Sequence, residues 1–282
     1  MSELTGKRAL VTGASSGIGA EIARLLAAEG VALVLTARRK DALDRIAAEC
    51  AARGATVEVI TADLGQPGAA AALWEAATAA PAASGGTPAP IDIRINNAGF
   101  GYYRPFTTAD WARDAELLQL NITSLVELSR RFVAARAGRT ERAYLLNVAS
   151  IAAYQSTPNF AVYASSKAFV RNFTEALHDE LAGSPISVTC LCPGGTRTEF
   201  HAQAGAGDYG WLANRSMLDA DAVAAIGLRA LRAGRRTVIP GVLNKLSCFG
   251  VRLVPRRFAS WMATRLLGKP RPGALPSRTG AA

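Results

Sequence analysis

Two side chains that could move a proton lie four residues apart in the segment Tyr163-Ala164-Ser165-Ser166-Lys167. Residues at this spacing share one face of a helix, so the Tyr163 phenol and the Lys167 ammonium would project into the same space. A free tyrosine has a pKa of about 10, and a neighbouring positive charge lowers that pKa because it favours the phenolate. The pair is therefore a candidate general acid/base. The same spacing also arises by chance, as a surface tyrosine beside a surface lysine, and the rest of the chain must decide between these interpretations.

A glycine-rich loop near the N-terminus indicates a site for a dinucleotide. The apolar run 8–12 is followed by Gly13-Ala14-Ser15-Ser16-Gly17-Ile18-Gly19, and apolar residues then recur at helical spacing. Glycines let the backbone approach a pyrophosphate closely, and the exposed N–H groups at a helix start favour that anion. The spacing is G-x-x-x-G-x-G, and a tight turn between strand and helix that binds nothing is the alternative.

The end of the next predicted strand, residues 31–36, bears on the choice of cofactor. An acidic residue there would accept hydrogen bonds from the adenosine ribose of NAD, whereas an arginine accommodates the 2′-phosphate of NADP. In this chain the acid is missing, and Arg38 and Arg39 follow the strand. The sequence therefore predicts NADP(H), with Arg38 as the first candidate and Arg39 as the second. Two solvated cations at the start of the predicted helix 41–53 are the alternative.

Polar motifs also follow the next two predicted strands. Asp63 and Leu64 come after the strand 57–61, and Asn96-Asn97-Ala98-Gly99 comes after the strand 91–95. Ligands of open parallel sheets bind outside the carboxyl ends of the strands, which is where these motifs would lie. The alternation of strands and helices predicts an α/β fold, a Rossmann-type doubly wound parallel sheet in a single domain with a C-terminal helical extension.

These motifs, followed by Asn121, Ser150, Tyr163 with Lys167 and then Pro193-Gly194, resemble the short-chain dehydrogenase/reductase family over residues 5–240. The resemblance implies a catalytic tetrad. Ser150 would hydrogen-bond the substrate oxygen, Tyr163 would be the acid/base, Lys167 would hold the nicotinamide ribose, and Asn121 would hold a water of the proton relay. The cofactor-binding residues that it implies are Gly13, Ser15, Ser16, Gly17, Ile18, Gly19, Arg38, Arg39, Asp63, Leu64, Asn97, Ala98, Gly99, Tyr163, Lys167, Pro193, Gly194, Thr196 and Thr198. The chain departs from the family pattern at Arg94, in a strand that is normally apolar, and at Gly195.

The resemblance implies an oxidoreductase that interconverts a ketone or aldehyde and an alcohol by hydride transfer with NADP(H), and with NAD(H) as the less favoured cofactor. Hydride transfer is the chemistry of the cofactor, and the protein must orient the substrate and stabilise charge on its oxygen. A silent nucleotide-binding or membrane-surface scaffold with the same fold is the alternative. Such a protein would show an altered tetrad, and none of the four positions is altered.

Aromatic residues suggest the nature of the substrate. They cluster at positions expected to border the pocket, and some of them would belong to the core instead: Phe100, Tyr102, Tyr103, Tyr154, Phe200, Tyr209 and Trp211. An apolar lining favours a hydrophobic carbonyl or alcohol over a sugar or a small acid. The predicted substrate-binding residues are Ser150, Tyr154, Tyr163, Phe200 and Trp211. Glycines alternate with aromatics over residues 196–217, as in a substrate lid, and a long surface loop is the alternative.

Charge divides the chain into two parts. The 282 residues include 32 Lys and Arg against 22 Asp and Glu, a net charge of +10. Twelve of these cations and no acid follow position 221, so residues 1–221 sum to 20 minus 22, or −2. We therefore predict a nucleotide-binding domain over 1–240 and a basic amphipathic extension over 241–282. The motif Val238-Ile239-Pro240-Gly241 followed by such a tail resembles the DltE-like branch of the family.

The extension admits three interpretations. Apolar positions interleaved with cations suit an anionic membrane surface, and they equally suit packing on the domain or on a partner subunit. Nucleic acid is the weakest option because no reader motif is present. The chain shows no secretory signal and no long uncharged apolar run, which predicts a cytoplasmic protein, peripheral at a membrane if the tail binds lipid. The scattered cysteines predict neither a disulfide framework nor a metal site, and the family resemblance implies a homo-oligomer.

Overall fold

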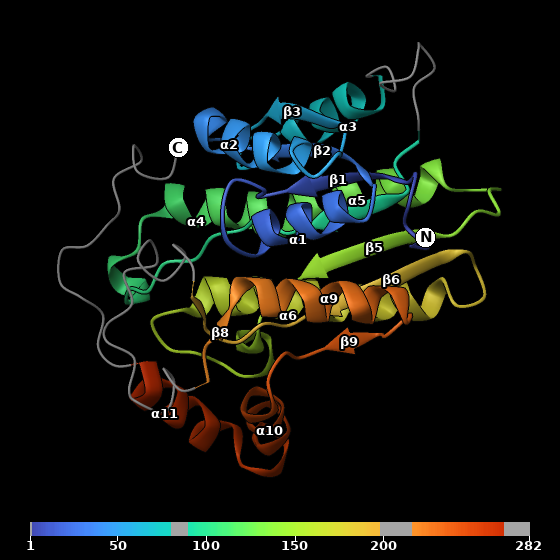
Figure 1. The fold of residues 1–282 in the computed structure, drawn as a ribbon. Helices are drawn as coiled ribbons and strands as arrows, with labels where there is room; N and C mark the ends of the chain where they lie inside the picture. Colours follow the sequence, from blue (N-terminus) through green and yellow to red (C-terminus); the bar gives the residue numbers. More distant parts are fainter. Residues whose placement is uncertain (1, 80–89, 198–215, 268–282) are drawn as a thin grey trace.

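The computed structural model describes residues 2–79, 90–197 and 216–267, and it confirms the predicted α/β fold. Seven parallel strands form one sheet in the order β3-β2-β1-β4-β5-β6-β9, with helices on both faces (Figure 1). The strands are β1 (Arg8–Thr12), β2 (Ala32–Ala37), β3 (Val57–Thr61), β4 (Ile93–Asn96), β5 (Ala143–Val148), β6 (Ile186–Leu191) and β9 (Thr237–Val238). Two-residue strands β7 (Thr196–Arg197) and β8 (Leu218–Asp219) pair separately.

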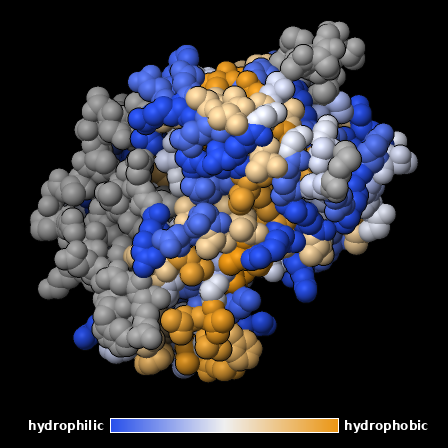
Figure 2. Space-filling view, in the orientation of Figure 1, coloured by the Kyte–Doolittle hydropathy of each residue, from blue (hydrophilic) through white to orange (hydrophobic). Residues whose placement is uncertain are grey.

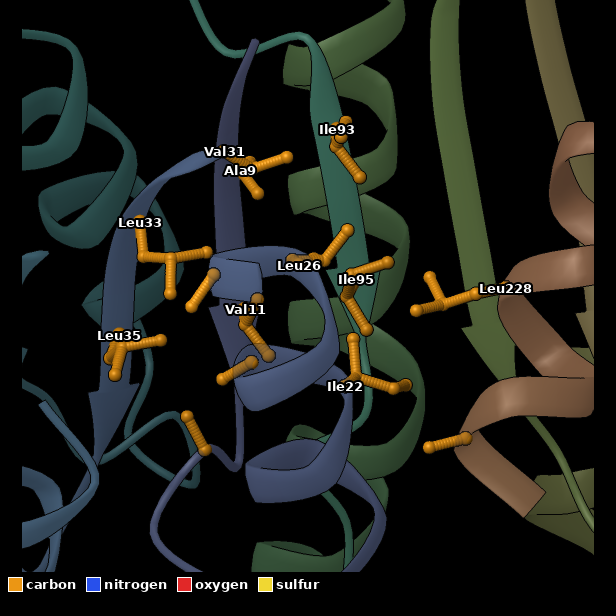
Figure 3. Close-up of a cluster of buried hydrophobic side chains, with 14 of the residues drawn as sticks. Ala9, Val11, Ile22, Leu26, Val31, Leu33, Leu35, Ile93, Ile95 and Leu228 are labelled. Carbon is orange, nitrogen blue, oxygen red and sulfur yellow. The ribbon is translucent and has the colours of Figure 1, made fainter. Parts of the chain in front are cut away.

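Three helices cover one face of the sheet and bury a hydrophobic core against it. They are α1 (Gly17–Ala28), α2 (Lys40–Ala51) and α9 (Ala220–Arg232). Ile22 and Leu26 of α1 lie over Val11 of β1, and Leu228 of α9 closes the same cluster (Figure 3). Both faces of β1 are buried because the sheet is covered twice, which explains the continuous apolar run in its sequence.

A second set of helices covers the opposite face. It comprises α3 (Ala69–Ala79), α4 (Trp111–Leu118), α5 (Leu125–Ala135) and α6 (Ala161–Glu180). Strand residues alternate between the two faces, so Leu10 contributes to this second core while its neighbours Ala9 and Val11 contribute to the first. Phe132 of α5 lies fully buried in this layer.

The order of the sheet places the ligand site. The chain winds outward from β1 to β2 and β3, and then returns to place β4 on the other side of β1. Crevices for ligands form where the strand order reverses, at the carboxyl ends of the strands. The glycine loop follows β1 and the Asn-Ala-Gly turn follows β4, so the two motifs meet at this point.

The predicted C-terminal helical extension is also present. After β9 the chain forms α10 (Val242–Gly250), the short helix η4 (Val251–Leu253) and α11 (Arg256–Leu267), which lie at the foot of the molecule in Figure 1. Gly241 precedes α10 with φ of 88°, a conformation that other residues rarely adopt. Among the described residues, no helix is both long and apolar enough to cross a membrane.

Arg94 is a buried cation in β4. Its Nη1 donates a 3.1 Å hydrogen bond to the main-chain oxygen of Leu10. Within the described part of the chain, its Nε and Nη2 have no hydrogen-bond partner. Burial lowers the pKa of Arg94 to about 9. A buried charge without a counter-charge costs free energy, so this departure from the family pattern destabilises the centre of the sheet.

We expect Arg94→Met to raise the free energy of unfolding at neutral pH by about 1–4 kcal/mol, because methionine fills a similar volume without the charge. Urea denaturation measures this difference. Arg8→Met is the matched control in the neighbouring strand. Arg8 is also buried, but it binds Glu58 at 2.9 Å and the main-chain oxygen of Ala77 at 2.7 Å, so its loss should destabilise the protein. A loss of stability in Arg94→Met would contradict the cost assigned to this charge.

Candidate active site

The predicted residues surround a cavity of about 490 Å³ at the carboxyl ends of the strands, a volume within the usual range for a ligand pocket. The predicted cofactor residues that line it are Gly13, Ser15, Ser16, Gly17, Ile18, Arg38, Arg39, Asp63, Leu64, Asn97, Ala98, Gly99, Tyr163, Lys167, Pro193, Gly194 and Thr196. Gly19 does not line the cavity, because it lies against Gly13 and Asn97. Thr198 lies outside the described residues.

Tight packing explains two glycines of the loop. A Cβ at Gly13 would lie 2.7 Å from Asn97 Nδ2, and a Cβ at Gly19 would lie 2.3 Å from the main-chain oxygen of Gly13. Ser16 precedes α1 without a side-chain hydrogen bond to the helix start, so its hydroxyl does not cap the first-turn N–H groups. A cavity wall made of this loop and helix start fits the pyrophosphate of a dinucleotide.

A network of buried side chains joins the strand ends that form the site. Thr12 Oγ1 at the end of β1 donates to the main-chain oxygen of Ile95 and accepts from the main-chain N–H groups of Asn97 and Ala98. The Asn97 amide in turn donates to the main-chain oxygens of Thr12 at 3.1 Å and Gly13 at 3.0 Å. These bonds tie the Asn-Ala-Gly turn to the end of the central strand β1.

The network continues from β4 into β5 and α6. Asn96 Nδ2 donates to Asn147 Oδ1 at 2.8 Å and to Ser129 Oγ at 2.9 Å. Asn147 Nδ2 then donates to Thr174 Oγ1 at 3.0 Å. Because Thr174 belongs to α6, the same network positions the helix that presents Tyr163 and Lys167.

Asn121 lies in a short π-helix, η2 (Gln119–Ser124), between α4 and α5. π-helical turns inside α-helices occur frequently at functional sites. The Asn121 amide accepts from the main-chain N–H of Phe100 and donates to its main-chain oxygen, at 3.1 and 3.0 Å, and it also donates to Ser166 Oγ. The side chain therefore holds the segment after the Asn-Ala-Gly turn against α6. Its expected role in holding a water stays a prediction.

The Tyr163 ring is fixed by its surroundings. The Phe160 ring stacks on it with centroids 4.3 Å apart and an interplanar angle of 22°. A Cβ at Gly101 would lie 2.4 Å from Tyr163 Cδ2, so only glycine fits there. The sequence predicted neither contact, since Phe160, three residues before Tyr163, belongs to no chemical motif and Gly101 lies on a remote segment. Together they restrict the direction of the phenol.

Lys167 is a buried ammonium one helical turn after Tyr163. Its Nζ donates to the main-chain oxygen of Val148 at 2.9 Å and lies 5.8 Å from the centroid of the Tyr163 ring. Burial lowers the pKa of Lys167 to about 8, so the side chain is still mostly charged at neutral pH. Beside it, a Cβ at Gly99 would lie 3.2 Å from Nζ. A buried charge next to a phenol is the arrangement that the sequence predicted.

Ser150 begins the short helix η3 (Ile151–Tyr154) that follows β5. Its Oγ accepts a 3.1 Å hydrogen bond from the main-chain N–H of Ala152. This bond occupies a lone pair and leaves the hydroxyl proton for donation to a substrate oxygen. Ser150, Tyr163 and Lys167 all line the cavity, so the structure brings these three predicted catalytic groups together.

Arg38 has acidic partners that the sequence did not reveal. Its Nη1 lies 3.0 Å from Glu116 Oε1 and 4.0 Å from Asp63 Oδ1. Glu116 also pairs with Arg113 at 2.7 Å, and both of these residues belong to α4. Glu116 is far from Arg38 in the sequence and belongs to no motif, so only the fold identifies it. The candidate phosphate-binding arginine is thus already in contact with carboxylates.

The aromatic prediction is confirmed in part. Phe100 and Tyr154 line the cavity. Tyr102 and Tyr103 are not among its lining residues and are buried, so they are among the aromatics that belong to the core instead. The Tyr102 hydroxyl donates to Asp114 instead, and burial raises the pKa of that phenol. The remaining predicted aromatics, Phe200, Tyr209 and Trp211, lie outside the described residues, as does most of the predicted lid 196–217.

The extension packs on the domain, which is one of the arrangements that its sequence allowed, and it forms a wall of the cavity, which the sequence did not predict. Its lining residues are Leu243, Asn244, Ser247, Cys248, Val251 and Ala263. Asn244 Nδ2 donates to the main-chain oxygen of Pro240 at 2.8 Å. A Cβ at Gly194 would lie 2.5 Å from the same Nδ2, so α10 packs directly on the Pro-Gly turn.

Within the described ranges, no cluster of three or more His, Cys, Asp or Glu side chains is placed to hold a metal ion.

A parallel sheet with its glycine loop, helix start and buried Tyr-Lys pair at one cavity defines a nicotinamide-dinucleotide oxidoreductase. The family model described as short chain dehydrogenase matches residues 7–208. The chain therefore belongs to the short-chain dehydrogenase/reductase family, whose members act on CH–OH and carbonyl groups.

Two relatives illustrate the similarity in sequence. An uncharacterized oxidoreductase of Myxococcus xanthus is 33% identical over 202 residues, which are 72% of this chain and 77% of that protein. Galactitol 2-dehydrogenase (L-tagatose-forming) of Cereibacter sphaeroides is 37% identical over 199 residues, which are 70% of this chain and 74% of that protein.

Solved structures extend the similarity through the C-terminal helices. A Sphingobium yanoikuyae short-chain dehydrogenase in complex with NADPH has a TM-score of 0.74 and 28% identity, covering 96% of this chain and 99% of that one. A Burkholderia phymatum short-chain dehydrogenase/reductase in complex with NAD has a TM-score of 0.76 and 26% identity over the same shares. A bulky-bulky ketone specific alcohol dehydrogenase from Comamonas testosteroni has a TM-score of 0.70 and 25% identity, covering 96% and 98%.

The buried Lys167 charge generates a prediction about stability and pH. Its folded pKa of about 8 is below the ordinary 10.5, so the charge costs stability fully below pH 8 and progressively less as the pH rises toward 10.5. We expect the free energy of unfolding of Lys167→Met, measured by urea denaturation, to exceed that of the parent by about 3 kcal/mol at pH 7. The difference should shrink as the pH rises through the range 8 to 10.5.

Lys40→Met is the control for this experiment, because Lys40 is exposed and pairs only with Asp44 among the described residues. It should leave stability nearly unchanged at every pH. A stability difference between Lys167→Met and the parent that is independent of pH would show that the buried ammonium does not titrate as described.

Proposed function

We propose that the chain is an NADP(H)-dependent oxidoreductase that interconverts a hydrophobic ketone or aldehyde and the corresponding alcohol, with Tyr163 as the acid/base. The observation that supports this most directly is the single cavity shared by the glycine loop and by Ser150, Tyr163 and Lys167. A silent scaffold with the same fold would have no need for a buried ammonium beside a fixed phenol, since the buried charge lowers stability without a reaction to serve.

The chain supplies binding, orientation and proton transfer. A bound nicotinamide cofactor supplies or removes the hydride. Ser150 donates a hydrogen bond from its hydroxyl to the substrate oxygen, and the bond that its Oγ accepts from the Ala152 N–H holds it in place. Tyr163 donates its proton to that oxygen in reduction, and its phenolate accepts the alcohol proton in oxidation. Two donors aimed at one oxygen stabilise the charge that develops there.

Lys167 assists Tyr163 through its charge. A positive group near the phenol favours the phenolate that must form in each turnover. The main-chain oxygen of Val148 accepts one hydrogen bond from the ammonium and holds it in position. Two N–H groups remain to donate to the ribose hydroxyls of a cofactor. Asn121 acts through position, since its amide holds Phe100 and Ser166 around the Tyr-Lys pair. In this proposal Asn121 is the fourth member of the tetrad and orders the proton relay.

The preference for NADP(H) rests on Arg38 and Arg39, which line the cavity after β2 where NAD-binding proteins place an acid. A 2′-phosphate there would meet two guanidinium groups, a strong partner for a phosphate. The structural neighbours include complexes with NADPH and with NAD, so the family similarity does not choose between them. The choice rests on this chain's own residues.

The preference for a hydrophobic substrate rests on apolar side chains that line the cavity together with the catalytic groups. They include Tyr154 from η3 and Leu243, Cys248 and Val251 from the extension. Apolar lining with a few polar groups favours an apolar carbonyl compound. The ketone-specific structural neighbour agrees with this inference, whereas the galactitol dehydrogenase relative acts on a polyol. The extension, which lies beyond the matched family region, supplies the distinguishing residues.

Tyr163→Phe tests the acid/base assignment. We expect turnover of carbonyl substrates to fall by about a thousandfold or more, because the ring remains and the proton is lost. Binding of NADPH, followed by fluorescence titration, should change by less than about threefold. A variant that kept a tenth of the parent rate would refute the role of Tyr163.

The double variant Arg38→Ala with Arg39→Ala tests the cofactor preference. We expect kcat/KM for NADPH to fall by at least about tenfold, or 1.4 kcal/mol, and kcat/KM for NADH to change little. A panel of apolar ketones and aldehydes assayed with both cofactors in parallel supplies the values. Equal losses with the two cofactors would mean that the arginines do not read the 2′-phosphate.

A further inference from the structure

The exposed apolar surface of the described chain is concentrated in the extension. Eight of the eleven large hydrophobic side chains that are exposed among the described residues lie between positions 242 and 262. Figure 2 shows them in part as a hydrophobic surface over α10, at the foot of the molecule. Contiguous exposed apolar surface usually marks an interaction site. The rest of the described surface does not repeat this concentration.

Helix α10 has two distinct faces. Asn244 and Cys248 are buried, and with Val251 they line the cavity at helical spacing. The side chains of Val242, Leu246, Phe249 and Leu253 follow the same spacing on the opposite side and are 71%, 61%, 59% and 71% exposed. One helix therefore separates the cavity from an apolar stripe that no described residue covers.

Helix α11 adds aromatic side chains and cations. Phe258 and Trp261 are exposed and stack with centroids 5.7 Å apart, and the Arg265 guanidinium lies 5.1 Å from the Trp261 ring. Ala259 and Ala263 are buried on its inner side. The cations exposed along this stretch are Lys245, Arg252, Arg256, Arg257 and Arg265, and the sequence contains no acidic residue after Asp221.

From this apolar and cationic surface we propose that α10, η4 and α11 dock on an anionic phospholipid bilayer and lie in its interfacial plane. Exposed aliphatic and aromatic side chains enter the acyl boundary, while arginine and lysine reach the headgroups, which is the composition of interfacial helices. We call this set of exposed residues the docking surface. The proposal concerns a partner of the protein and does not depend on the proposed reaction.

A second copy of the chain fits the docking surface less well. A two-fold interface places the same patch of each subunit against itself. Five cations would then face five cations, with no acidic residue in the segment to compensate them, and like charges across an interface oppose association. A nucleic acid would satisfy the cations, but it offers no apolar surface for a stripe of valine, leucine and phenylalanine.

Vesicle flotation with the full chain tests the proposal. We expect the protein to float with vesicles of equal parts phosphatidylcholine and phosphatidylglycerol, and to bind phosphatidylcholine vesicles more weakly. Added salt should weaken the anionic preference because the headgroup attraction is screened. Leu246→Ser with Phe249→Ser should lower the partition coefficient by more than about tenfold on both vesicle types, because two exposed hydrophobes leave the acyl boundary.

Charge reversal supplies the matched comparison. Arg256→Glu with Arg257→Glu should lower binding to anionic vesicles by more than about tenfold, since each cation near such a surface contributes about 1 kcal/mol. Arg45→Glu with Arg53→Glu makes the same change in net charge on and just after α2, at the opposite end of the molecule in Figure 1, and should retain more binding than the first pair.

Three outcomes would overturn the proposal. The first is a full chain that stays unbound to anionic vesicles. The second is an equal loss of binding in both charge variants, which would indicate a net-charge effect. A third is that Leu246→Ser with Phe249→Ser dissociates an oligomer in sedimentation velocity without changing vesicle binding, which would assign the stripe to a second copy. Thermal unfolding of each variant, compared with the parent, confirms that the substitutions at these exposed positions leave the fold intact.

Discussion

The whole site depends on a buried hydrogen-bond network that fixes the carboxyl ends of three strands relative to one another. Thr12 and Asn97 tie β1 to the turn after β4, and Asn96 and Asn147 tie β4 to β5. A parallel sheet alone sets the spacing of strands, but the turns beyond its edge have no ladder bonds to hold them. The hydrogen bonds between these side chains and the main chain, in a low-dielectric interior, hold those turns in one arrangement. This network therefore also positions the glycine loop and helix α6.

Two buried cations lower the free energy of unfolding of this protein. Lys167 and Arg94 are both buried cations, yet only Lys167 stands beside a phenol in the cavity. The role proposed for Lys167 in proton transfer would explain the cost of its burial, since functional sites often break the rules that favour stability. Arg94 has no such explanation in the structure. Lys167 is thus a destabilising group with a proposed chemical role, whereas Arg94 is a group of similar burial without one.

Much of this arrangement was predictable because it depends on local spacing. Tyr163 and Lys167 share a helix face, and strand ends in a parallel sheet meet at one edge, so motifs that follow successive strands must converge. Contacts between remote segments were not predictable. Glu116 reaches Arg38 from α4, and Asn244 reaches the Pro-Gly turn from α10, through packing that no local pattern encodes. Which of the aromatics would be core was not predictable either: Tyr102 is buried because its hydroxyl donates to a buried acid of α4, Asp114.

The pairing of Arg38 with Glu116 changes what cofactor affinity measures. A guanidinium that already has a carboxylate partner does not simply gain a phosphate, because one anion displaces or crowds another. If a 2′-phosphate binds Arg38 as proposed, the phosphate would replace Glu116 as its partner, and the binding free energy would be the difference between two ion pairs of the same cation. Glu116 would keep Arg113 as a partner, which would lower the cost of this exchange. Under the proposal, a residue of α4 outside the cavity lining would therefore influence the selectivity between dinucleotides.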